Sequence, residues 1–314
     1  MMPGALPSGP LALAIPEMWL AGSACLILLC DVYFGSTRRS LTATLTMLAL
    51  TIGVGLTGQY GLTTQRFLLF NGLYVADSLA GFLKMAAFVA MATAIFYSQD
   101  YLEQRAIRGG EYYVLCLTAL LGIFVLISAN SLLTVYLGIE LLSLSLYALV
   151  AFDRDSGIAA EAATKYFVLG AISSGILLYG MSMLYGLTGT LDLDQLSSTV
   201  RRGPDAALII GVAFVVAAIA FKFGAVPFHM WVPDVYEGAP TSVTLFIATV
   251  SNLGSFALIL RLLTHGLGGT PAIWTQMLMA VAVLSLLVKA LADGAYQRAD
   301  MSVSPVEGSV YWPW

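Results

Sequence analysis

Residues 217–246 read AAIAFKFGAVPFHMWVPDVYEGAPTSVTLF, an apolar stretch with a single lysine, Lys222. Within the 18 residues after it, the chain contains Gly224, Pro227, Pro233 and Pro240. A proline removes a backbone N–H and its ring clashes with the preceding helical turn, so a helix that enters this stretch must break. Broken membrane helices are tolerated where they line a cavity or are buried in protein. The stretch therefore predicts a broken membrane helix near Lys222.

The chain as a whole has the composition of a membrane protein. Of its 314 residues, 59% are hydrophobic and 10% are charged, whereas a soluble domain carries about 25% charged residues. A soluble fold of this size cannot hide so much apolar surface, because most residues of a small domain touch water. The net charge is −4 and no block of like charges occurs. Composition thus excludes a disordered chain, a nucleic-acid-binding protein and a secreted disulfide scaffold.

Nine apolar runs are long enough to cross a bilayer, for which about 20 residues are needed. Lipid offers no hydrogen-bond partners to the backbone, so runs of this length must be helices. The runs are 11–34, 41–58, 78–98, 112–128, 132–152, 162–187, 206–223, 241–263 and 273–291. We therefore predict an all-α, polytopic membrane protein with about nine transmembrane helices.

The sequence does not indicate a metal or cofactor site. Its three cysteines, Cys25, Cys30 and Cys116, lie in apolar runs and lack the Cys-x-x-Cys spacing of a metal site, which is typical of packed thiols. The chain contains neither a P-loop nor a Gly-x-Gly-x-x-Gly motif that follows a strand. We expect no metal and no cofactor in this chain.

Ionisable side chains inside the expected spans need a reason, because each is costly at the centre of a bilayer. Glu140 lies near the middle of the run 132–152, and on a helix Tyr136, Ser143 and Tyr147 share its face. A hydrogen-bonded contact between two helices is one interpretation, although serine or asparagine would make it at lower cost. We predict that Glu140 exchanges protons or holds an ion pair.

Two lysines follow carboxylates at spacings that allow contact on a helix. Lys165 lies four residues after Glu161, which favours an ion pair on one helix face. This pair is either a plain interfacial one or a source of positive charge that tunes the proton affinity of a carboxyl on the preceding helix. Lys84 lies seven residues after Asp77, and we expect an interfacial pair there.

Lys222 carries the clearest functional signal. A lysine held away from water at a helix break can release a proton near neutral pH, and His229, seven residues on, is suited to relay it. The alternatives are a lysine that snorkels from a helix end and an interfacial histidine that bonds a carbonyl. With Glu140 and Lys165, these residues predict a membrane protein that moves protons or cations.

Longer stretches point to a family. The stretches are PEMWLAGSACLILLCDVYF (16–34), LTVYLGIELLSLSLYALVAF (133–152), EAATKYFVLGAISSGILLYGMSMLYGLTGT (161–190) and FKFGAVPFHMWVPDVYEGAPTSVTLFIATVS (221–251). They resemble the antiporter-like subunits N of bacterial NADH–quinone oxidoreductases, respiratory complex I, over roughly residues 14–288. The resemblance implies an antiporter-like fold with two inverted five-helix repeats, each with a broken helix.

The resemblance also implies roles for individual residues. Glu140 matches the family's fifth-helix glutamate, Lys165 the sixth-helix lysine that pairs with it, and Glu161 the acid one turn before that lysine. Lys222 matches the broken-helix lysine, and His229 the nearby histidine. Such sites relay protons, driven by NADH oxidation elsewhere in the complex. The resemblance places NADH, FMN, iron–sulfur clusters and quinone in partner subunits, with the other membrane subunits and the peripheral arm as partners in the bacterial inner membrane.

The resemblance suggests a division of the chain and two departures from the family. We expect N-terminal helices 1–3 in residues 1–110, a five-helix repeat in 111–265, the start of an incomplete second repeat in 266–291, and an irregular tail in 292–314. Asn252 stands where the family carries a lysine, and an amide cannot carry a proton's charge. Because the match ends after the first helix of the second repeat, we expect a truncated or frame-altered chain that does not pump by itself.

Two other functions remain open. The first is a subunit of an Mrp-type cation/proton antiporter, which would share the lysine and glutamate core. The second is a non-functional truncated remnant, which Asn252 and the tail favour. The phrases VYEGAP (235–240) and LSLSLYAL (142–149) favour subunit N over the Mrp-type antiporter.

Overall fold

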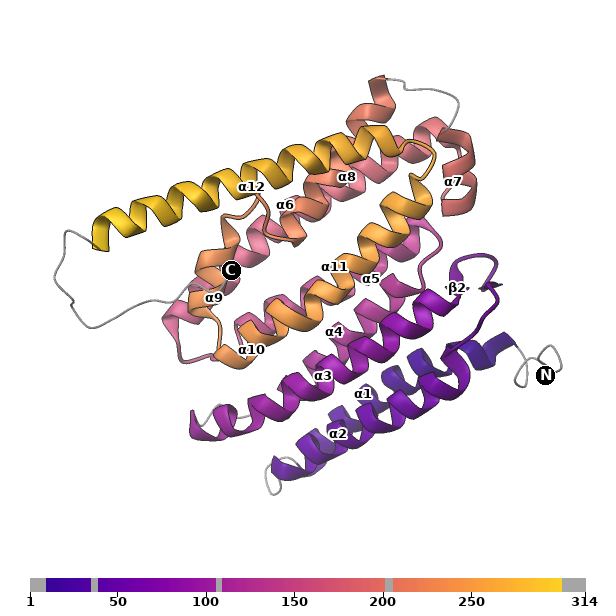
Figure 1. Cartoon of the computed structure of the whole chain (residues 1–314). Coiled ribbons are helices and arrows are strands. Elements are labelled where there is room, and N and C mark those ends of the chain that lie inside the picture. The colour runs from indigo at the N-terminus through magenta and orange to yellow at the C-terminus, as the bar shows by residue number, and fades with distance from the viewer. Residues whose placement is uncertain (1–9, 35–38, 106–108, 201–205, 301–314) are drawn as a thin grey trace.

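The computed structural model describes residues 10–34, 39–105, 109–200 and 206–300 (Figure 1). The N-terminal part consists of helices and one short hairpin. Its elements are the 3₁₀ helix η1 (Pro10–Ala14), α1 (Ile15–Phe34), α2 (Arg39–Leu56), the π-helical turn η2 (Thr57–Gly61), β1 (Phe67–Leu69), β2 (Tyr74–Ala76) and α3 (Ser78–Gln104). The two strands pair antiparallel, with Leu68 opposite Val75. This hairpin was not predicted, because two three-residue strands leave no period in the sequence.

The second part of the chain contains the helices that carry the predicted site. They are α4 (Glu111–Ile127), α5 (Leu132–Val150), α6 (Gly157–Thr188), α7 (Leu193–Val200), α8 (Ala206–Lys222), α9 (Trp231–Gly238), α10 (Thr241–Phe246), η3 (Ile247–Ser251), α11 (Asn252–Leu258), η4 (Ile259–Gly266) and α12 (Pro271–Asp300). The segments η3 and η4 are π-helical, so α10 to η4 form one continuous helical rod with irregular turns.

The long helices lie side by side as a bundle, from α1 and α2 at one edge to α12 at the other (Figure 1). α4 packs against α5 and α1, and α6 packs against α8. Glycines allow the closest of these approaches: a Cβ on Gly122 of α4 would lie 2.6 Å from the backbone N of Leu142 on α5. Small residues serve the same purpose at helix contacts in membranes. The close packing fixes α5, from which the site is built.

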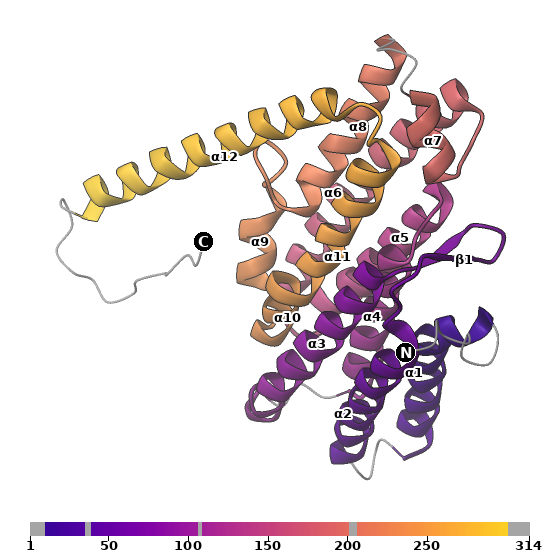
Figure 2. The ribbon, with the colours of Figure 1, turned by 45° about the vertical axis from the view of Figure 1, so that its right-hand side comes forward.

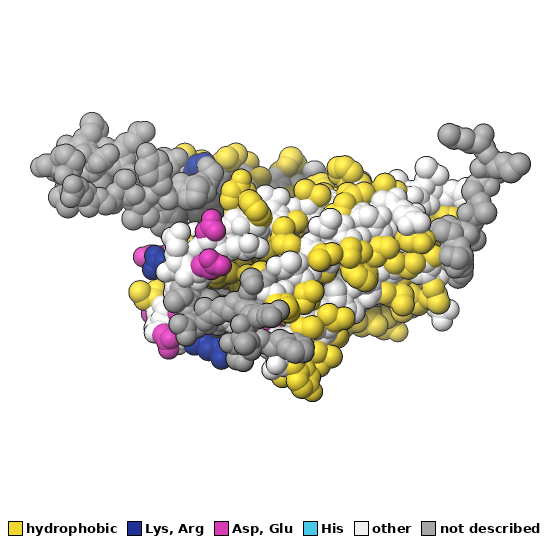
Figure 3. Space-filling model, turned by 90° about the horizontal axis from the view of Figure 1, so that it is seen from below, with side chains coloured by type: hydrophobic (Ala, Val, Ile, Leu, Met, Phe, Trp, Pro, Cys, Tyr) yellow, Lys and Arg dark blue, Asp and Glu magenta, His cyan; other side chains and the backbone are white. Residues whose placement is uncertain are grey.

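The surface of the bundle suits a bilayer. One face is hydrophobic along its length, and the acidic and basic side chains visible on it gather at one end (Figure 3). Among the described residues, seven helical segments are long and apolar enough to cross a membrane, and the shorter apolar helices α4 and α8 fall at two further expected spans. The chain is therefore an all-α, multi-pass membrane protein, as predicted, while the number of nine crossings stays a prediction.

The break near Lys222 is confirmed. α8 ends at Lys222 and α9 begins at Trp231. Between them the backbone turns at Gly224, whose φ of 61° is a left-handed conformation that glycine adopts without strain. The indole Nε1 of Trp231 donates a 2.9 Å hydrogen bond to the carbonyl of Phe221 near the end of α8, which also accepts a 3.0 Å hydrogen bond from the backbone N of Gly224.

The C-terminal helix differs from the prediction. The expected irregular tail began at residue 292, but α12 continues to Asp300. The sequence of this extension, ADGAYQRAD, contains alanine, glutamine and arginine, which favour helix even outside an apolar run. The remainder of the tail, 301–314, lies outside the described residues. Figure 2 shows α12 diverging from the rest of the bundle.

Candidate proton-transfer site

Lys222 and Ser143 join the broken helix to α5. The Nζ of Lys222 donates a 2.5 Å hydrogen bond to the Oγ of Ser143, which is buried. The Ser143 hydroxyl donates in turn to the carbonyl of Ile139, one turn earlier, at 2.6 Å. Since a hydroxyl has one hydrogen and two lone pairs, this orientation leaves a lone pair free to accept from the ammonium.

Glu140 lies on the same face of α5, three residues before Ser143. Its carboxylate accepts a short hydrogen bond from the hydroxyl of Ser174 on α6, and Ser174 also lies 3.3 Å from the hydroxyl oxygen of Tyr136. Glu140 and Lys222 are close enough for their opposite charges to attract. The predicted polar face of α5 thus meets α6 through Glu140 and α8 through Ser143.

Lys165 lies away from Glu140. Its Nζ pairs with Glu161 at 2.9 Å, as the spacing predicted, and with Asp234 of α9 at 3.2 Å, and all three side chains are exposed or nearly so. The expected pairing of Lys165 with Glu140 is wrong in this structure. The helix turn of α6 that reaches Glu140 is the one with Ser174, nine residues further on, or about 13 Å along the axis.

His229 lies in the segment between α8 and α9. Its carbonyl accepts a 2.9 Å hydrogen bond from the backbone N of Val232. The Nδ1 of its ring is buried without a hydrogen-bond partner among the described residues, and no bond there joins it to Lys222. The structure therefore brings His229 to the break, where the described residues show no hydrogen bond between it and the lysine.

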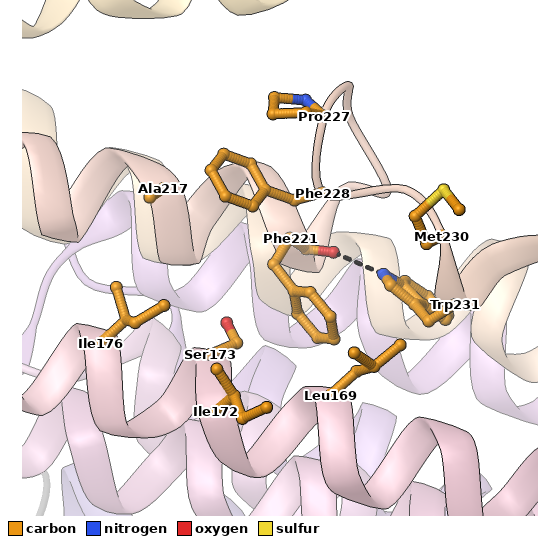
Figure 4. A pocket seen from close by; sticks show the side chains of 10 residues that line it. All are labelled: Leu169, Ile172, Ser173, Ile176, Ala217, Phe221, Pro227, Phe228, Met230 and Trp231. Carbon is orange, nitrogen blue, oxygen red and sulfur yellow. Dashed lines mark hydrogen bonds between the residues drawn. The ribbon is translucent and has the colours of Figure 1, made fainter.

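An apolar cavity of about 170 Å³ adjoins the break (Figure 4). Helices α6 and α8 line one side of the cavity, and the segment between α8 and α9 lines the other. Its lining includes Ile172, Ser173, Ala217, Phe221, Phe228 and Trp231. Ser173 supplies a polar side chain to this lining, and its neighbour in sequence, Ser174, bonds Glu140. The break therefore borders a space, as expected for a broken membrane helix.

Asn252 does not take part in this site. Its side chain is exposed, and its amide donates a 2.7 Å hydrogen bond to the carbonyl of Ala248 on its own helix. In the part of the chain that the structure describes, Asn252 makes no hydrogen bond to Lys222.

Two buried ion pairs were not predicted. Lys84 pairs with Glu17 of α1 instead of Asp77. Asp77 caps the N-terminus of α3 through the backbone N of Ala80, and accepts two hydrogen bonds, of 2.7 and 2.9 Å, from Arg261 of η4. Seven residues span about 10 Å of helix, which separates Lys84 from the capping position of Asp77. The partners lie up to 184 residues apart in sequence, so no local pattern reveals them.

The described residues contain no group of three or more histidine, cysteine, aspartate or glutamate side chains that could hold a metal ion. Cys116 is buried as predicted, whereas Cys25 lies exposed on α1.

A family model described as "NADH:quinone oxidoreductase/Mrp antiporter, TM" matches residues 129–300. The NADH-quinone oxidoreductase subunit N of Thioalkalivibrio sulfidiphilus is 51% identical to this chain over 277 residues, which are 87% of this chain and 58% of that protein. The corresponding subunit of Nitrosomonas europaea is 47% identical over 287 residues, or 91% and 60% of the two chains. The chain thus spans about three fifths of the length of these relatives.

Solved structures are similar in fold. A chain of respiratory complex I from Thermus thermophilus with bound aureothin matches 78% of this chain with 30% sequence identity and a TM-score of 0.65, and 52% of that chain is covered. A chain of the Mrp complex from Dietzia sp. matches 81% of this chain with 20% identity and a TM-score of 0.68, and 49% of that chain is covered. The second likeness concerns the fold alone.

Proposed function

Because this chain belongs to the transmembrane NADH:quinone oxidoreductase/Mrp antiporter family, we propose that it carries protons as the antiporter-like subunit N of a bacterial NADH–quinone oxidoreductase. In this proposal it is a membrane part of an enzyme complex and performs no redox chemistry itself. Its partners are the other membrane subunits and the peripheral arm, in the inner membrane. NADH, FMN, iron–sulfur clusters and quinone are bound by those partners.

The single observation that supports proton transfer most strongly is the contact of Lys222 with Ser143, one helical turn from Glu140. Lys222 alternates between ammonium and amine, and Glu140 between carboxylate and acid. A proton leaves Nζ of Lys222 for the Ser143 oxygen, while the Ser143 hydroxyl turns from the carbonyl of Ile139 and gives up its own proton, through a water, to the carboxylate of Glu140. Both end groups become neutral in this step, so no uncompensated charge is left in the membrane, where it would be costly.

The other predicted site residues have auxiliary roles in this proposal. An exposed charged cluster lies where the N-terminal part of α6 meets α9, and it consists of Lys165, Glu161 and Asp234. We propose that this cluster gathers protons at the membrane surface. Among the described residues, the buried Nδ1 of His229 has no hydrogen-bond partner, which suits it to bond a water at the break and to relay a proton to Lys222.

We propose that residues 111–265 form the proton-conducting repeat. Glu140, Lys165, Lys222 and His229 all lie within it, on helices α5, α6 and α8 and at the break. Residues 1–110 supply the N-terminal helices, of which α1 and α3 pack against α4, and residues 266–291 begin a further repeat.

Co-purification tests the proposed complex. The chain, tagged in its native bacterium and extracted in mild detergent, is expected to retain NADH–quinone oxidoreductase activity and the peripheral arm. Recovery with cation/proton antiporter subunits and without NADH-oxidising activity would contradict subunit N and favour the Mrp-type antiporter. The fold likeness to the Mrp complex is the observation behind that second candidate.

A further inference from the structure

A second group of buried ionisable side chains lies among the N-terminal helices. Lys84 of α3 is 2% exposed, and its Nζ forms an ion pair with Oε1 of Glu17 on α1. The same Nζ donates a 2.9 Å hydrogen bond to the hydroxyl oxygen of Tyr74 on β2. The Tyr74 hydroxyl lies 3.0 Å from Glu17 Oε1 and 3.0 Å from the carbonyl oxygen of Leu13. Helices α1 and α3 and strand β2 therefore meet at one carboxylate.

The two oxygens of Glu17 differ sharply in their surroundings. Oε1 faces Lys84, Tyr74 and the hydroxyl of Ser128, which lies 3.5 Å away at the end of α4. Oε2 is buried without a hydrogen-bond partner among the described residues. A buried acceptor without a partner is costly, and an ionised carboxylate can accept on both oxygens. Within the described part of the chain, Oε2 is thus an unpaired acceptor beside an Oε1 that has three partners.

Stability alone does not explain this group. A buried ion pair is often replaceable by apolar side chains of similar size without loss of stability, because removing two charges from water offsets their attraction. An ionisable pair inside a membrane segment is by default a functional site. The aromatic rings of Tyr74 and Phe124, with centroids 5.0 and 6.0 Å from the Lys84 Nζ, stabilise its positive charge in addition.

We propose that Glu17, Lys84 and Tyr74 form a second proton-binding site, separate from the site around Glu140 and Lys222. A hydronium ion gives a proton to Oε2 of Glu17: one O–H bond of the hydronium breaks, an O–H bond forms on Oε2, and a water molecule is left. Oε1 keeps its contacts with Lys84 and Tyr74, and the charge of the group rises by one. Release of the same proton to water restores the ion pair.

The proton reaches this site from the end of the bundle that carries the hairpin. Tyr74 belongs to the hairpin, and Glu17 lies in the first turn of α1. The Glu17 side chain is 13% exposed, against 2% for Lys84, so the carboxylate is the group nearer to solvent. Towards the middle of the bundle, Phe88 and Phe124 pack edge to face with centroids 4.7 Å apart, and both are fully buried. Uptake and release therefore occur on one side, and the site does not depend on the proposed function of Glu140 and Lys222.

Carbodiimide labelling tests the proposal on the full chain in native membranes. Dicyclohexylcarbodiimide modifies protonated carboxyls in apolar surroundings, and peptide mass spectrometry locates the label. Labelling of Glu17 is expected to rise as pH falls, by about tenfold per pH unit while the group is mostly ionised. Lys84→Met is expected to increase the labelling at neutral pH, because an unpaired buried carboxyl retains its proton. Lys289→Met, which removes an exposed lysine on α12, is expected to leave it unchanged.

Infrared titration provides an independent measurement. The unmutated chain is expected to show a carboxylic acid band that appears at low pH and that Glu17→Gln removes. The proposal is overturned if Glu17 takes no pH-dependent label and Glu17→Gln removes no titrating band. A loss of proton pumping in Lys222 variants, with Glu17 labelling unchanged, would leave the two sites independent as proposed.

Discussion

The Nζ of Lys222, the last residue of α8, donates a 2.5 Å hydrogen bond to the Oγ of Ser143 in the middle of α5. This contact links the helix break to the helix face that carries Glu140. The residues lie 79 positions apart in sequence, and the contact depends on α8 ending where it does. A continuous helix would keep the backbone hydrogen bonds that the break releases, and Lys222 would lie within a helix instead of at its end.

Substitution of Lys222 separates charge from proton transfer. Lys222→Ala is expected to abolish NADH-driven proton uptake because it removes both. Lys222→Arg keeps the charge but cannot release a proton, since the pKa of arginine exceeds about 12, and is expected to assemble normally without proton uptake. Inverted membrane vesicles report uptake, and immunoblots report assembly. Full activity in Lys222→Arg would mean that a fixed positive charge suffices.

Ser143→Ala removes the hydroxyl between the lysine and the carboxylate. We expect proton uptake to decrease by up to about 10²-fold. A positioned proton-transfer group contributes at least that much, but a water can partly replace the hydroxyl. Ser145→Ala is the matched control: Ser145 is also buried on α5, and it contacts Thr118 of α4 instead of the lysine. Equal decreases in the two variants would show that Ser143 acts only through packing.

Lys165→Gln is expected to retain most of its proton uptake, whereas Glu140→Gln is expected to lose it. Lys165 pairs with Glu161 and Asp234 on the exposed surface and does not touch Glu140. Removal of Lys165 therefore lowers the local supply of protons without removing a group from the transfer step. Uptake rates of the two variants at matched assembly check this. Complete loss in Lys165→Gln would require that Lys165 approach Glu140 in another conformation.

The buried pair of Asp77 and Arg261 is expected to govern stability. Asp77→Asn leaves Arg261 buried without its counter-charge, which costs about 3–5 kcal/mol. Asp194→Asn at the more exposed pair with Arg66 is the control, with an expected effect below about 1 kcal/mol. Thermal unfolding in detergent measures both. Similar losses in the two variants would contradict the special role of the buried pair.

The same pair gives a pH dependence. Burial would raise the pKa of Asp77, but the hydrogen bonds and charge of Arg261 outweigh it and hold the pKa below its usual value. A carboxyl with a lowered pKa stabilises the fold fully above its unfolded pKa of about 4, and this contribution is lost as pH falls through the folded pKa. At pH values below about 4, the free energy of unfolding is therefore expected to decrease more for the unmutated chain than for Asp77→Asn.

The sequence predicted those features of the site that depend on neighbours along the chain. The prolines after Lys222 predicted the break, the apolar runs predicted the bundle, and the spacing of Glu161 and Lys165 predicted their pair. Each follows from helix geometry or from proline stereochemistry. The polar face of α5 was also visible from its period.

The contacts between distant segments could not be predicted. Asp234 binds Lys165, and Ser174 binds Glu140. Both contacts depend on the relative positions of α6, α5 and α9 along their axes, which no local period in the sequence encodes. Lys84 was assigned to Asp77 because that carboxylate was near in sequence, whereas its partner Glu17 lies 67 positions before it on another helix. Helix packing decides such pairings. Small residues such as Gly122 determine how closely two helices approach, and composition does not reveal where they lie in the packed bundle.

Proton uptake per NADH oxidised in Glu140→Gln measures directly whether this carboxylate receives a transferred proton. The measurement uses inverted vesicles that contain the assembled complex, with Glu111→Gln as the control because its carboxylate is exposed on α4 and pairs with Arg154, outside the proposed site. If Glu140 exchanges protons with Lys222 through Ser143, Glu140→Gln assembles, keeps its hydrogen bond to Ser174, and takes up fewer protons per NADH than the unmutated and control chains. An unchanged ratio of protons to NADH in Glu140→Gln would contradict the account.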